Sequence, residues 1–575
     1  MEVQPRLDRE SLPFDRILPG KERYVFSVTR LDFLISKLAL QKNDGSWVNL
    51  TNSEAYISCR EGRTRFEVEG VPRGEYQTIR FLVGLEPELN KANPATYPPG
   101  HALNPEVNGL HWGWQGGYVF MAIEGRWRGR PEAGDQSKWQ MADGKEGGYS
   151  FHLANEPQLM RVELPVKLNF EQASRQAVRL GLDVRKVFAG INLDEANSTT
   201  HSRPGDKVAA KFARNVERAF AVETISSPVS NFAAGKVSFK PERLIAPNAT
   251  PYRLTISALF PRPELPRDNP LTEEGVELGR LLFHDRRLSV NNSQSCASCH
   301  ELSAAGADSG RAVSIGAEGK SGTRNAMPLF NLAWKSSFFW DGRAATLREQ
   351  VLQPIQNPDE MHQSLAGVVA RLQKEGYPVR FAGAFGSTEI SSDRIARALE
   401  QFLLTQVSYE SKFDRVIAGT AQFTDQEQRG FELFHTEYDP RREQYGADCF
   451  HCHGGALFQS VPFANNGLDA APKDAGRYAV TKREGDQGKF AVPSLRNLTA
   501  TGPYMHDGRF KSLEEVVEHY STGVKRSAML DPNLAKHPDG GVPLSAADKQ
   551  AVVAFLKTLT DERYLRVTNM VASAR

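Results

Sequence analysis

Four of the five cysteines fall into two copies of one short pattern. Cys296-Ala-Ser-Cys299-His300 and Cys449-Phe-His-Cys452-His453 both read C-x-x-C-H, the attachment signature of a covalent c-type haem. Two thiols at this spacing meet the two vinyl groups of one porphyrin, and the imidazole that follows reaches the iron. The sequence therefore predicts two haems. A zinc site that joins the pairs, or a redox disulfide, is the alternative for these cysteines. Cys59 is predicted to be a buried, unreactive thiol.

The two haem segments belong to an internal repeat. The segment from Trp340, "WDGRAATLREQVLQP", aligns without a gap with the segment from His506, "HDGRFKSLEEVVEHY". In this register Tyr520 falls opposite Pro354. A phenolic oxygen can ligate ferric iron, whereas proline has no side-chain ligand. We therefore expect Tyr520 and His453 to close haem 2, with His519 as the rival ligand, and haem 1 to keep an open face opposite His300.

The elements that must position these residues change in kind along the chain. Residues 23–165 alternate like short strands separated by Gly, Asp, Asn and Pro turns, a pattern that predicts an antiparallel β-sandwich. Residues 205–222 predict an amphipathic helix that closes this domain. From about residue 263 the pattern is helical; Thr272 is the expected N-cap of the first helix and Ser545 that of the last. The fold class is therefore multidomain, with a β-sandwich followed by a mainly α domain built from two cytochrome c-like halves.

The predicted domain limits follow these changes. A chain of 575 residues is too long for one core. We expect a β-sandwich domain over 1–225, a Pro/Ser/Asn-rich linker over 226–262 and a dihaem domain over 263–575. In the last, the haem 1 half covers about 270–420 and the haem 2 half about 421–565.

Composition excludes several classes of function. The formal net charge is +2 and no long run of one sign occurs, so nucleic acid is not an expected partner. No apolar run is long enough to span a bilayer. Because c-type haem is attached outside the bacterial cytoplasm, we expect a periplasmic protein. The first residues lack a secretion signal, so we expect the numbering to start at a processed or engineered end.

The motifs of the helical region resemble those of the bacterial dihaem cytochrome c peroxidase superfamily, and its MauG-like branch most of all. They include "LGRLLFHDRRLS", "FFWDGR", "QPIQNPDEM", "VPSLRNL" and "TGPYMHDG". The resemblance implies that Gln350 and Glu360 line the open face of haem 1, with Glu360 as acid/base for cleavage of the peroxide bond. It places Pro354 over the iron and Trp340 between the haems. It also implies a calcium ion between the haems, held by Asn331, Thr501 and the Pro503 carbonyl.

Two departures from ordinary dihaem peroxidases point to the MauG-like branch. Those enzymes carry a histidine in the loop before "RNxP" that closes haem 1 at rest; "ELSAAGADSGRAVSIGAEGKSGTRNAMP" contains none. They also use a methionine at the relay-haem position, where this chain has Tyr520. A hard phenolate oxygen stabilises oxidised iron, so the resemblance implies a high-valent dihaem state rather than a ferrous, donor-fed one.

The first domain resembles copper-binding proteins of the MbnP type. The cues are "SVTRLDFLISKLAL", "VPRGEYQTIRFLVGL", "LHWGWQGGYVFMAIEG", "FHLA" and "NVERAFAV". Such proteins are partnered with a MauG-like enzyme that oxidises one of their tryptophans to kynurenine. The resemblance implies that Trp114, or Trp112 beside it, is the oxidised residue. Core packing is the alternative for both. Copper, if bound, would use His111, His101 and His152.

The leading hypothesis is a self-modifying fusion that uses hydrogen peroxide to oxidise a tryptophan of its own N-terminal domain, linked to copper binding. Tethering would raise the effective concentration of that target. The first alternative is a dihaem peroxidase that reduces peroxide with an external cytochrome or cupredoxin as electron donor. The second is a periplasmic copper-binding or electron-transfer protein without peroxidase chemistry. The open face of haem 1 argues against the second, because haems that only relay electrons are usually closed on both faces.

Overall fold

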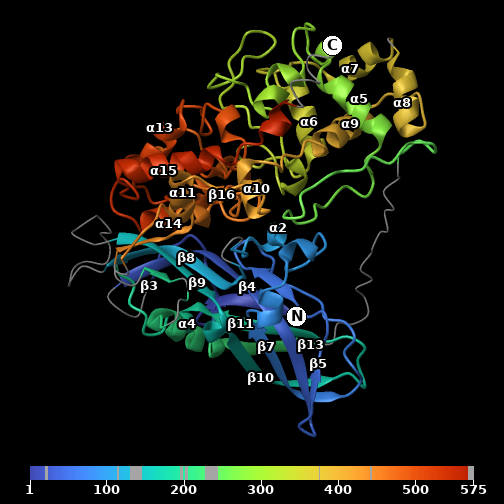
Figure 1. Ribbon diagram of the computed structural model, residues 1–575. Helices are drawn as coiled ribbons and strands as arrows, with labels where there is room; N and C mark the ends of the chain where they lie inside the picture. Colours follow the sequence, from blue (N-terminus) through green and yellow to red (C-terminus); the bar gives the residue numbers. More distant parts are fainter. Residues whose placement is uncertain are drawn as a thin grey trace. The chain divides into compact units, whose positions relative to one another are not determined.

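The computed structural model describes the chain apart from residues 20–23, 113–115, 130–145, 195–197, 201, 203–204, 227–243, 375, 441–442 and 567–575. The chain divides into two compact units (Figure 1). The first comprises Met1–Ser238 and Arg526–Asp539; the second comprises Phe239–Lys525 and Gly540–Arg575. No sequence pattern predicted that Arg526–Asp539, which follows the second haem motif, would belong to the first unit.

The first unit is a sandwich of two β-sheets. The order in the larger sheet is β10 (Met160–Asn169), β7 (Glu75–Val83), β4 (Tyr24–Lys42), β8 (Val119–Gly129), β9 (Glu146–Ala154) and β12 (Thr199–Thr200). Three short strands also pair with β4: β3 (Leu18–Pro19), β5 (Trp47–Asn49) and β6 (Ala55–Ser58). The order in the smaller sheet is β13 (Phe220–Ser226), β11 (Ala177–Asp183), β1 (Glu2–Leu7) and β2 (Glu10–Ser11).

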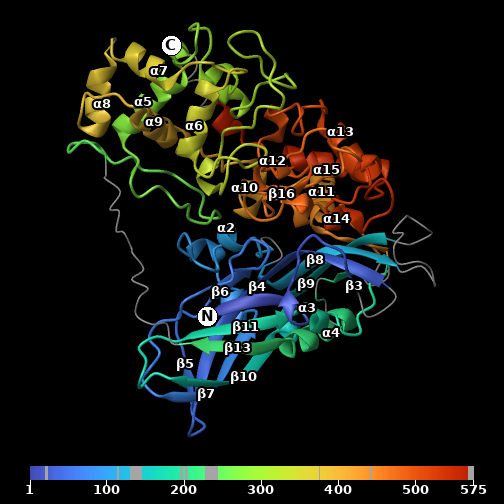
Figure 2. The same ribbon diagram turned by 180° about the vertical axis from the view of Figure 1, so that it is seen from behind.

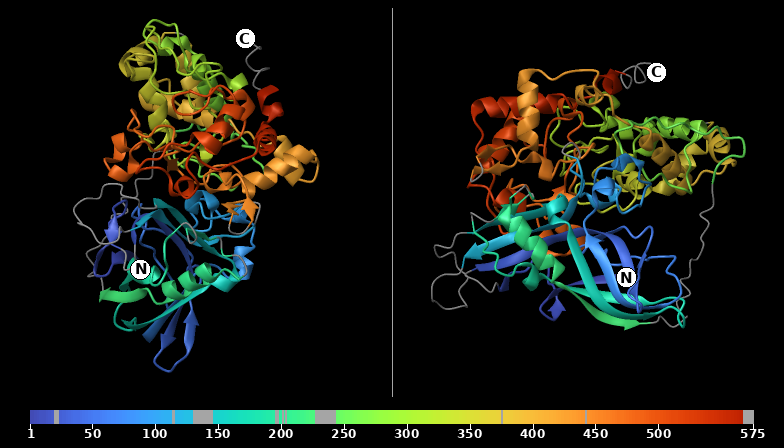
Figure 3. Two further views of the ribbon diagram at one scale, coloured as in Figure 1. Left: turned by 90° about the vertical axis from the view of Figure 1, so that its left-hand side faces the viewer. Right: turned by 60° about the horizontal axis from the view of Figure 1, so that its bottom comes forward.

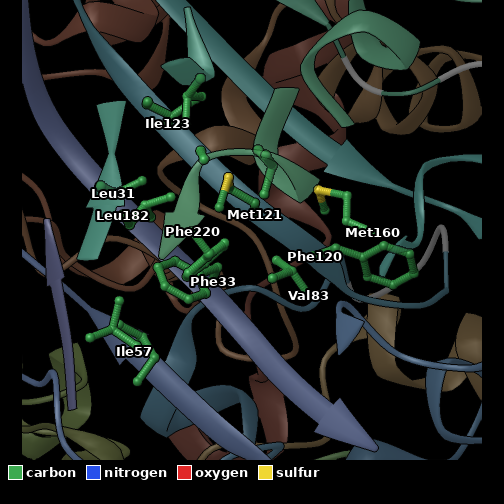
Figure 4. Close-up of a cluster of buried hydrophobic side chains, with 14 of the residues drawn as sticks. Leu31, Phe33, Ile57, Val83, Phe120, Met121, Ile123, Met160, Leu182 and Phe220 are labelled. Carbon is green, nitrogen blue, oxygen red and sulfur yellow. The ribbon is translucent and has the colours of Figure 1, made fainter. Parts of the chain in front are cut away.

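The core of this unit lies between the two sheets. Phe33 on β4 and Phe81 on β7 meet Phe220 on β13, with ring centroids 6.1 and 5.4 Å apart. Figure 4 shows Phe33 beside Phe220, surrounded by aliphatic side chains from both sheets. The alternation along β10, where Met160, Val162 and Leu164 are buried between exposed residues, is that of a strand with one face in the core.

The short helices of the first unit are α1 (Pro87–Asn90), α2 (Pro105–Asn108), α3 (Val184–Val187) and α14 (Pro532–Ala535). The longer α4 (Lys207–Glu217) begins at Asp206, whose carboxylate accepts from the backbone of Val208 and Ala209. Its buried Phe212 packs against Phe151 of β9, with ring centroids 4.5 Å apart. Figure 2 shows α4 beside the strands of the sandwich.

The β-sandwich and helical classes are confirmed, with two corrections. The helix predicted over 205–222 ends at Glu217, because residues from Phe220 onward pair with β11 as strand β13. The sandwich is also not wholly antiparallel: β1 runs parallel to β11, and β12 parallel to β9.

The second unit is mainly helical (Figure 3). Its helices are α5 (Glu273–Phe283), α6 (Leu347–Gln356), α7 (Leu365–Leu372), α8 (Tyr377–Phe385), α9 (Ser392–Leu404), α10 (Lys412–Ile417), α11 (Asp425–His435), α12 (Tyr478–Thr481), α13 (Leu513–Glu518) and α15 (Ala546–Lys557). Two short ribbons are formed by β14 (Tyr438–Asp439) with β15 (Gln444–Tyr445), and by β16 (Phe463–Ala464) with β17 (Phe490–Ala491). Thr272 and Ser545 cap α5 and α15 as predicted.

Local backbone features recur at the aligned positions of the two haem segments. Asn331 and Asn497 both have positive φ, 53° and 59°, and each is followed by one turn of 3₁₀ helix. Gly342 and Gly508 have φ of 66° and 65°. Thr346 caps α6 and Ser512 caps α13 through the same side-chain bond to the third helical residue. The repeat therefore has a counterpart in backbone conformation.

Candidate haem sites

The first haem motif opens onto a cavity of about 810 Å³ within the second unit. A cavity of this size, with paired thiols and an imidazole in its wall, is suited to a covalently attached haem. The sequence-predicted residues that line it are Cys296, Cys299, His300, Trp340, Gln350, Pro354 and Glu360. The structure thus brings both sides of the predicted haem 1 site into one cavity.

The histidines of the two C-x-x-C-H motifs are held in the tautomer that iron ligation needs. His300 donates from Nδ1 to the Gly306 carbonyl at 2.7 Å, and His453 donates from Nδ1 to the Phe458 carbonyl at 3.2 Å. With the proton fixed on Nδ1, each Nε2 lone pair is available to a metal. Burial lowers the pKa of both imidazoles, that of His453 to about 4, which keeps the rings neutral.

The residues predicted to lie opposite His300 come from helix α6 and the turn after it. Gln350 and Pro354 lie on α6, with Pro354 inside the helix. Glu360 follows on a tight turn, where Asn357 Nδ2 donates to Glu360 Oε1 at 2.8 Å. Burial is the largest influence on Glu360 and raises its pKa, while the Asn357 bond opposes that rise. Sequence reasoning missed Asn357, although its i,i+3 spacing to Glu360 within "QNPDEM" was a usable signal.

Gly316 holds the Glu360 turn from the other side. A Cβ at Gly316 would lie 2.2 Å from the Asp359 carbonyl oxygen and 2.8 Å from that of Glu360, so no larger residue fits. The Glu360 carbonyl also accepts a hydrogen bond of 2.7 Å from the Ala317 N–H. The backbone that carries the carboxylate is therefore tightly positioned.

Trp340 connects the segments of both motifs. Its indole N–H donates to the Asn325 carbonyl at 2.8 Å, and its own carbonyl accepts from the N–H of Ala491 on β17 at 2.7 Å. The Asn325 N–H in turn donates to the carbonyl of His506, the residue aligned with Trp340 in the repeat. Trp340 is 8% exposed and lines the haem 1 cavity.

The aligned positions of Pro354 and Tyr520 differ in backbone as well as side chain. After α13 the chain forms a π-helical turn over His519–Gly523 that carries Tyr520. Turns of this kind are rare in proteins, and those that occur are often found at functional sites. Asn466 Nδ2 lies 3.5 Å from Tyr520 Oη and 3.4 Å from Met505 Sδ. His519 donates from Nε2 to the Asn466 carbonyl at 3.0 Å, so this ring nitrogen of His519, the rival ligand, is engaged with the backbone.

The residues implied for calcium are buried in the second unit. Asn331 uses its amide in two bonds with Ser408: Oδ1 accepts from the Ser408 N–H at 2.9 Å and Nδ2 donates to the Ser408 carbonyl at 3.1 Å. Thr501 is 8% exposed, and Pro503 follows a cis peptide bond. Oxygen donors from Asn331, Thr501 and the Pro503 carbonyl would suit a hard cation. This ligand set stays a prediction.

Trp114 and Trp139 lie outside the described residues, and the remaining tryptophans of the first unit differ in environment. Trp112 is half-buried and packs against the sandwich core. Trp47 stacks under the Arg80 guanidinium, 4.0 Å from its ring centroid. Trp127 is 4% exposed, and its indole N–H has no hydrogen-bond partner in the described part of the chain.

The three histidines predicted for copper do not form a common cluster. His101 Nδ1 accepts from the Leu103 N–H at 3.1 Å, which places the proton of the neutral ring on Nε2. His152 Nε2 bonds to Glu124 Oε1 at 2.9 Å. His111 packs edge-on against Tyr118, and burial lowers its pKa to about 4.

Among the described residues, one group of three His, Cys, Asp or Glu side chains lies close enough to hold a metal ion. It consists of Glu437, Asp448 and His451, in the segment of the second haem motif, and His451 forms an ion pair of 2.9 Å with Asp448. Over the same described residues, no helix is both long and apolar enough to cross a membrane.

Comparison with known proteins matches both parts of the chain. A family model described as di-haem cytochrome c peroxidase matches residues 273–422, and the MbnP model matches residues 1–202. The methylamine utilization protein MauG of Methylophilus methylotrophus is 38% identical over 307 residues, which cover 52% of this chain and 87% of that protein. Cytochrome c551 peroxidase of Nitrosomonas europaea is 36% identical over 302 residues, 51% of this chain and 82% of that protein.

A solved structure is similar as well. The crystal structure of a MauG-like protein associated with microbial copper homeostasis has a TM-score of 0.50 and 35% identity, and the match covers 55% of this chain and 97% of that one. The chain therefore belongs to the MauG-like dihaem cytochrome c peroxidase family, with an MbnP domain fused in front. Its C-terminal part is a dihaem peroxidase-type enzyme.

Proposed function

We propose that this protein is a peroxide-dependent dihaem oxidoreductase that oxidises a tryptophan of its own N-terminal domain. One observation carries the proposal: a single cavity is lined by His300 of the first haem motif and, from α6 and the following turn, by Gln350, Pro354 and the carboxylate of Glu360. The haems, when bound, supply the oxidising equivalents taken from peroxide.

The residues around Glu360 suit proton transfer to and from peroxide. Asn357 holds Glu360 Oε1, so Oε2 is the atom that would take a proton from one oxygen of hydrogen peroxide and return it to the other oxygen, which leaves as water. The remaining oxygen, together with its two oxidising equivalents, would pass to a bound haem 1. Gln350 orients the peroxide by hydrogen bonding. Pro354 limits water in the cavity, because its ring is apolar and offers no donor.

Tyr520 and Trp340 have complementary roles. Tyr520 closes haem 2 and favours its oxidised forms, since a hard anionic oxygen prefers oxidised iron. Trp340, fixed by Asn325 and buried, carries holes between the haems. The donor bond to the Asn325 carbonyl keeps the indole proton in place while the ring is oxidised.

The proposed product is kynurenine. One tryptophan and two molecules of hydrogen peroxide give N-formylkynurenine and two molecules of water, as the indole C2–C3 bond is cleaved. Water then hydrolyses the formamide, which releases formic acid and leaves kynurenine. Trp114 is the favoured target and Trp112 the second. Both tryptophans lie in the fused MbnP region, so the covalent link gives the substrate a high effective concentration.

Copper binding by the N-terminal domain is the second part of the proposal. The MbnP match supports copper, and His111, His101 and His152 are the candidate ligands in this domain. We also propose calcium at Asn331, Thr501 and Pro503, and a periplasmic location, because covalent haem attachment takes place there.

The competing function is a peroxidase that takes its electrons from an external donor. Relatives named cytochrome c551 peroxidase favour this alternative. The test measures peroxide consumption by the full haem-loaded chain with and without a reduced small cytochrome c. The proposed function predicts no acceleration by the cytochrome. Rapid, sustained cytochrome oxidation would support the peroxidase instead.

A further inference from the structure

Lys335 brings a positive charge into the haem 1 cavity that no sequence motif predicted. It follows directly after the 3₁₀ turn Leu332–Trp334, and its backbone N–H donates to the Leu332 carbonyl at 3.1 Å. The neighbouring Trp334 is buried, and its indole N–H donates to the Pro261 carbonyl at 2.7 Å. The backbone is thus fixed where the half-buried Lys335 side chain lines the cavity.

The other cations of this cavity are already paired or exposed to water. Arg324 forms ion pairs of 2.7 Å with both Asp341 and Asp474. Arg343 pairs with Asp341 at 3.2 Å and stacks over a phenyl ring. Lys473 is exposed at the cavity's edge.

The Lys335 ammonium, by contrast, has no hydrogen bond or ion pair with any described residue of the chain. Loss of water around it disfavours its charged form and lowers the pKa of Lys335 to about 8. A partly buried charge without a partner is costly, and an anion in the cavity would relieve that cost.

We infer that Lys335 binds a propionate of haem 1. This inference rests on the proposed function, in which a haem occupies the cavity. The propionates are the anionic groups of a haem, and the protein's own carboxylates already neutralise the two arginines. An ammonium–carboxylate bond is charge-assisted and stronger than a neutral hydrogen bond.

The pairing has a consequence that can be measured without turnover. A positive charge near the porphyrin favours the reduced iron, so its removal lowers the reduction potential of haem 1. The propionate that loses its partner also changes its vibrational signature. Haem 2 provides an internal reference in each sample.

The experiment compares the haem-loaded full chain with Lys335→Met, Lys335→Gln and Lys335→Arg, and with Lys473→Met as a matched control that removes a lysine from the same cavity's exposed edge. Spectroelectrochemical titration gives the midpoint potential of each haem, and resonance Raman spectroscopy gives the propionate bands.

Lys335→Met and Lys335→Gln are expected to lower the haem 1 potential and shift its propionate band, whereas Lys335→Arg and Lys473→Met stay near the parent protein. Loss of haem 1 from Met and Gln variants but not from the Arg variant also supports the pairing. If the haem 1 midpoint potential and propionate band are the same in Lys335→Met and Lys473→Met, the pairing of Lys335 with a propionate is overturned. A parent protein without haem at Cys296 and Cys299 would overturn the proposed function itself.

Discussion

Asn357 and Glu360 form the hydrogen bond that sets the protonation of the proposed acid/base: Nδ2 donates to Oε1 at 2.8 Å, against a burial that raises the carboxyl's pKa. If ionised Glu360 takes the peroxide proton, the rate of reaction with peroxide rises with pH through this pKa. Asn357→Leu removes the bond that lowers the pKa, so the acid limb of the profile should move to higher pH. Stopped-flow rates across pH measure it, and an unmoved limb would contradict the assignment.

Glu360→Gln keeps the shape of the side chain but cannot take up the proton. Because positioned acid/base groups contribute about 100-fold or more to rate, the reaction with peroxide should slow by that order. Glu389→Gln, which makes the same change at an exposed carboxylate outside the cavity lining, is the matched control and should react like the parent protein. Undiminished rates in Glu360→Gln would remove Glu360 from the mechanism.

Tyr520→Phe should alter the ferric spectrum of haem 2 while that of haem 1 persists, because it removes the proposed oxygen ligand. Electronic absorption and electron paramagnetic resonance spectra measure the change. Tyr504→Phe is the control, since it also removes a tyrosine hydroxyl from the haem 2 half, in this case one bonded to the Leu498 carbonyl at 2.7 Å. If both variants keep the parent spectrum, Tyr520 is not the ligand.

Gly541 packs against the backbone of Tyr520. A Cβ at Gly541 would lie 2.2 Å from the Tyr520 carbonyl oxygen, at a φ of +122°. Gly541→Ala should therefore shift the haem 2 spectrum and lower the free energy of unfolding by about 1–3 kcal/mol. Gly419→Ala, also at positive φ but with nothing within 4 Å, separates backbone strain from contact. Equal effects of both would show that the contact with Tyr520 is unimportant.

The sequence could predict which residues come together in the haem 1 cavity, because the register of short motifs fixes which residues follow the first C-x-x-C-H motif. Cys296, Gln350 and Glu360 line one cavity, as that register requires. Lys335 and Asn466 were not predicted, since their roles depend on chain segments that fold back over long distances. Local periodicity cannot show such partners.

The same reason accounts for the errors in the first domain. Strand β1 pairs with β11, from Glu2 opposite Arg179, and no local pattern signals a partner so remote in sequence. The apolar spacing over 205–222 suits a helix, but pairing with β11 overrides it from Phe220 onward. The three histidines suggested for copper were grouped by residue type alone, and the structure does not bring their side chains into one cluster.

Peptide mass spectrometry of the haem-loaded full chain, before and after hydrogen peroxide, tests the central claim most directly. We predict that the peptide containing Trp112 and Trp114 loses one carbon and gains one oxygen at a single tryptophan, and that the change is absent in Glu360→Gln and after Trp114→Phe. Trp47 and Trp127 serve as internal controls. An unchanged mass at every tryptophan, together with complete consumption of the peroxide, would contradict the account.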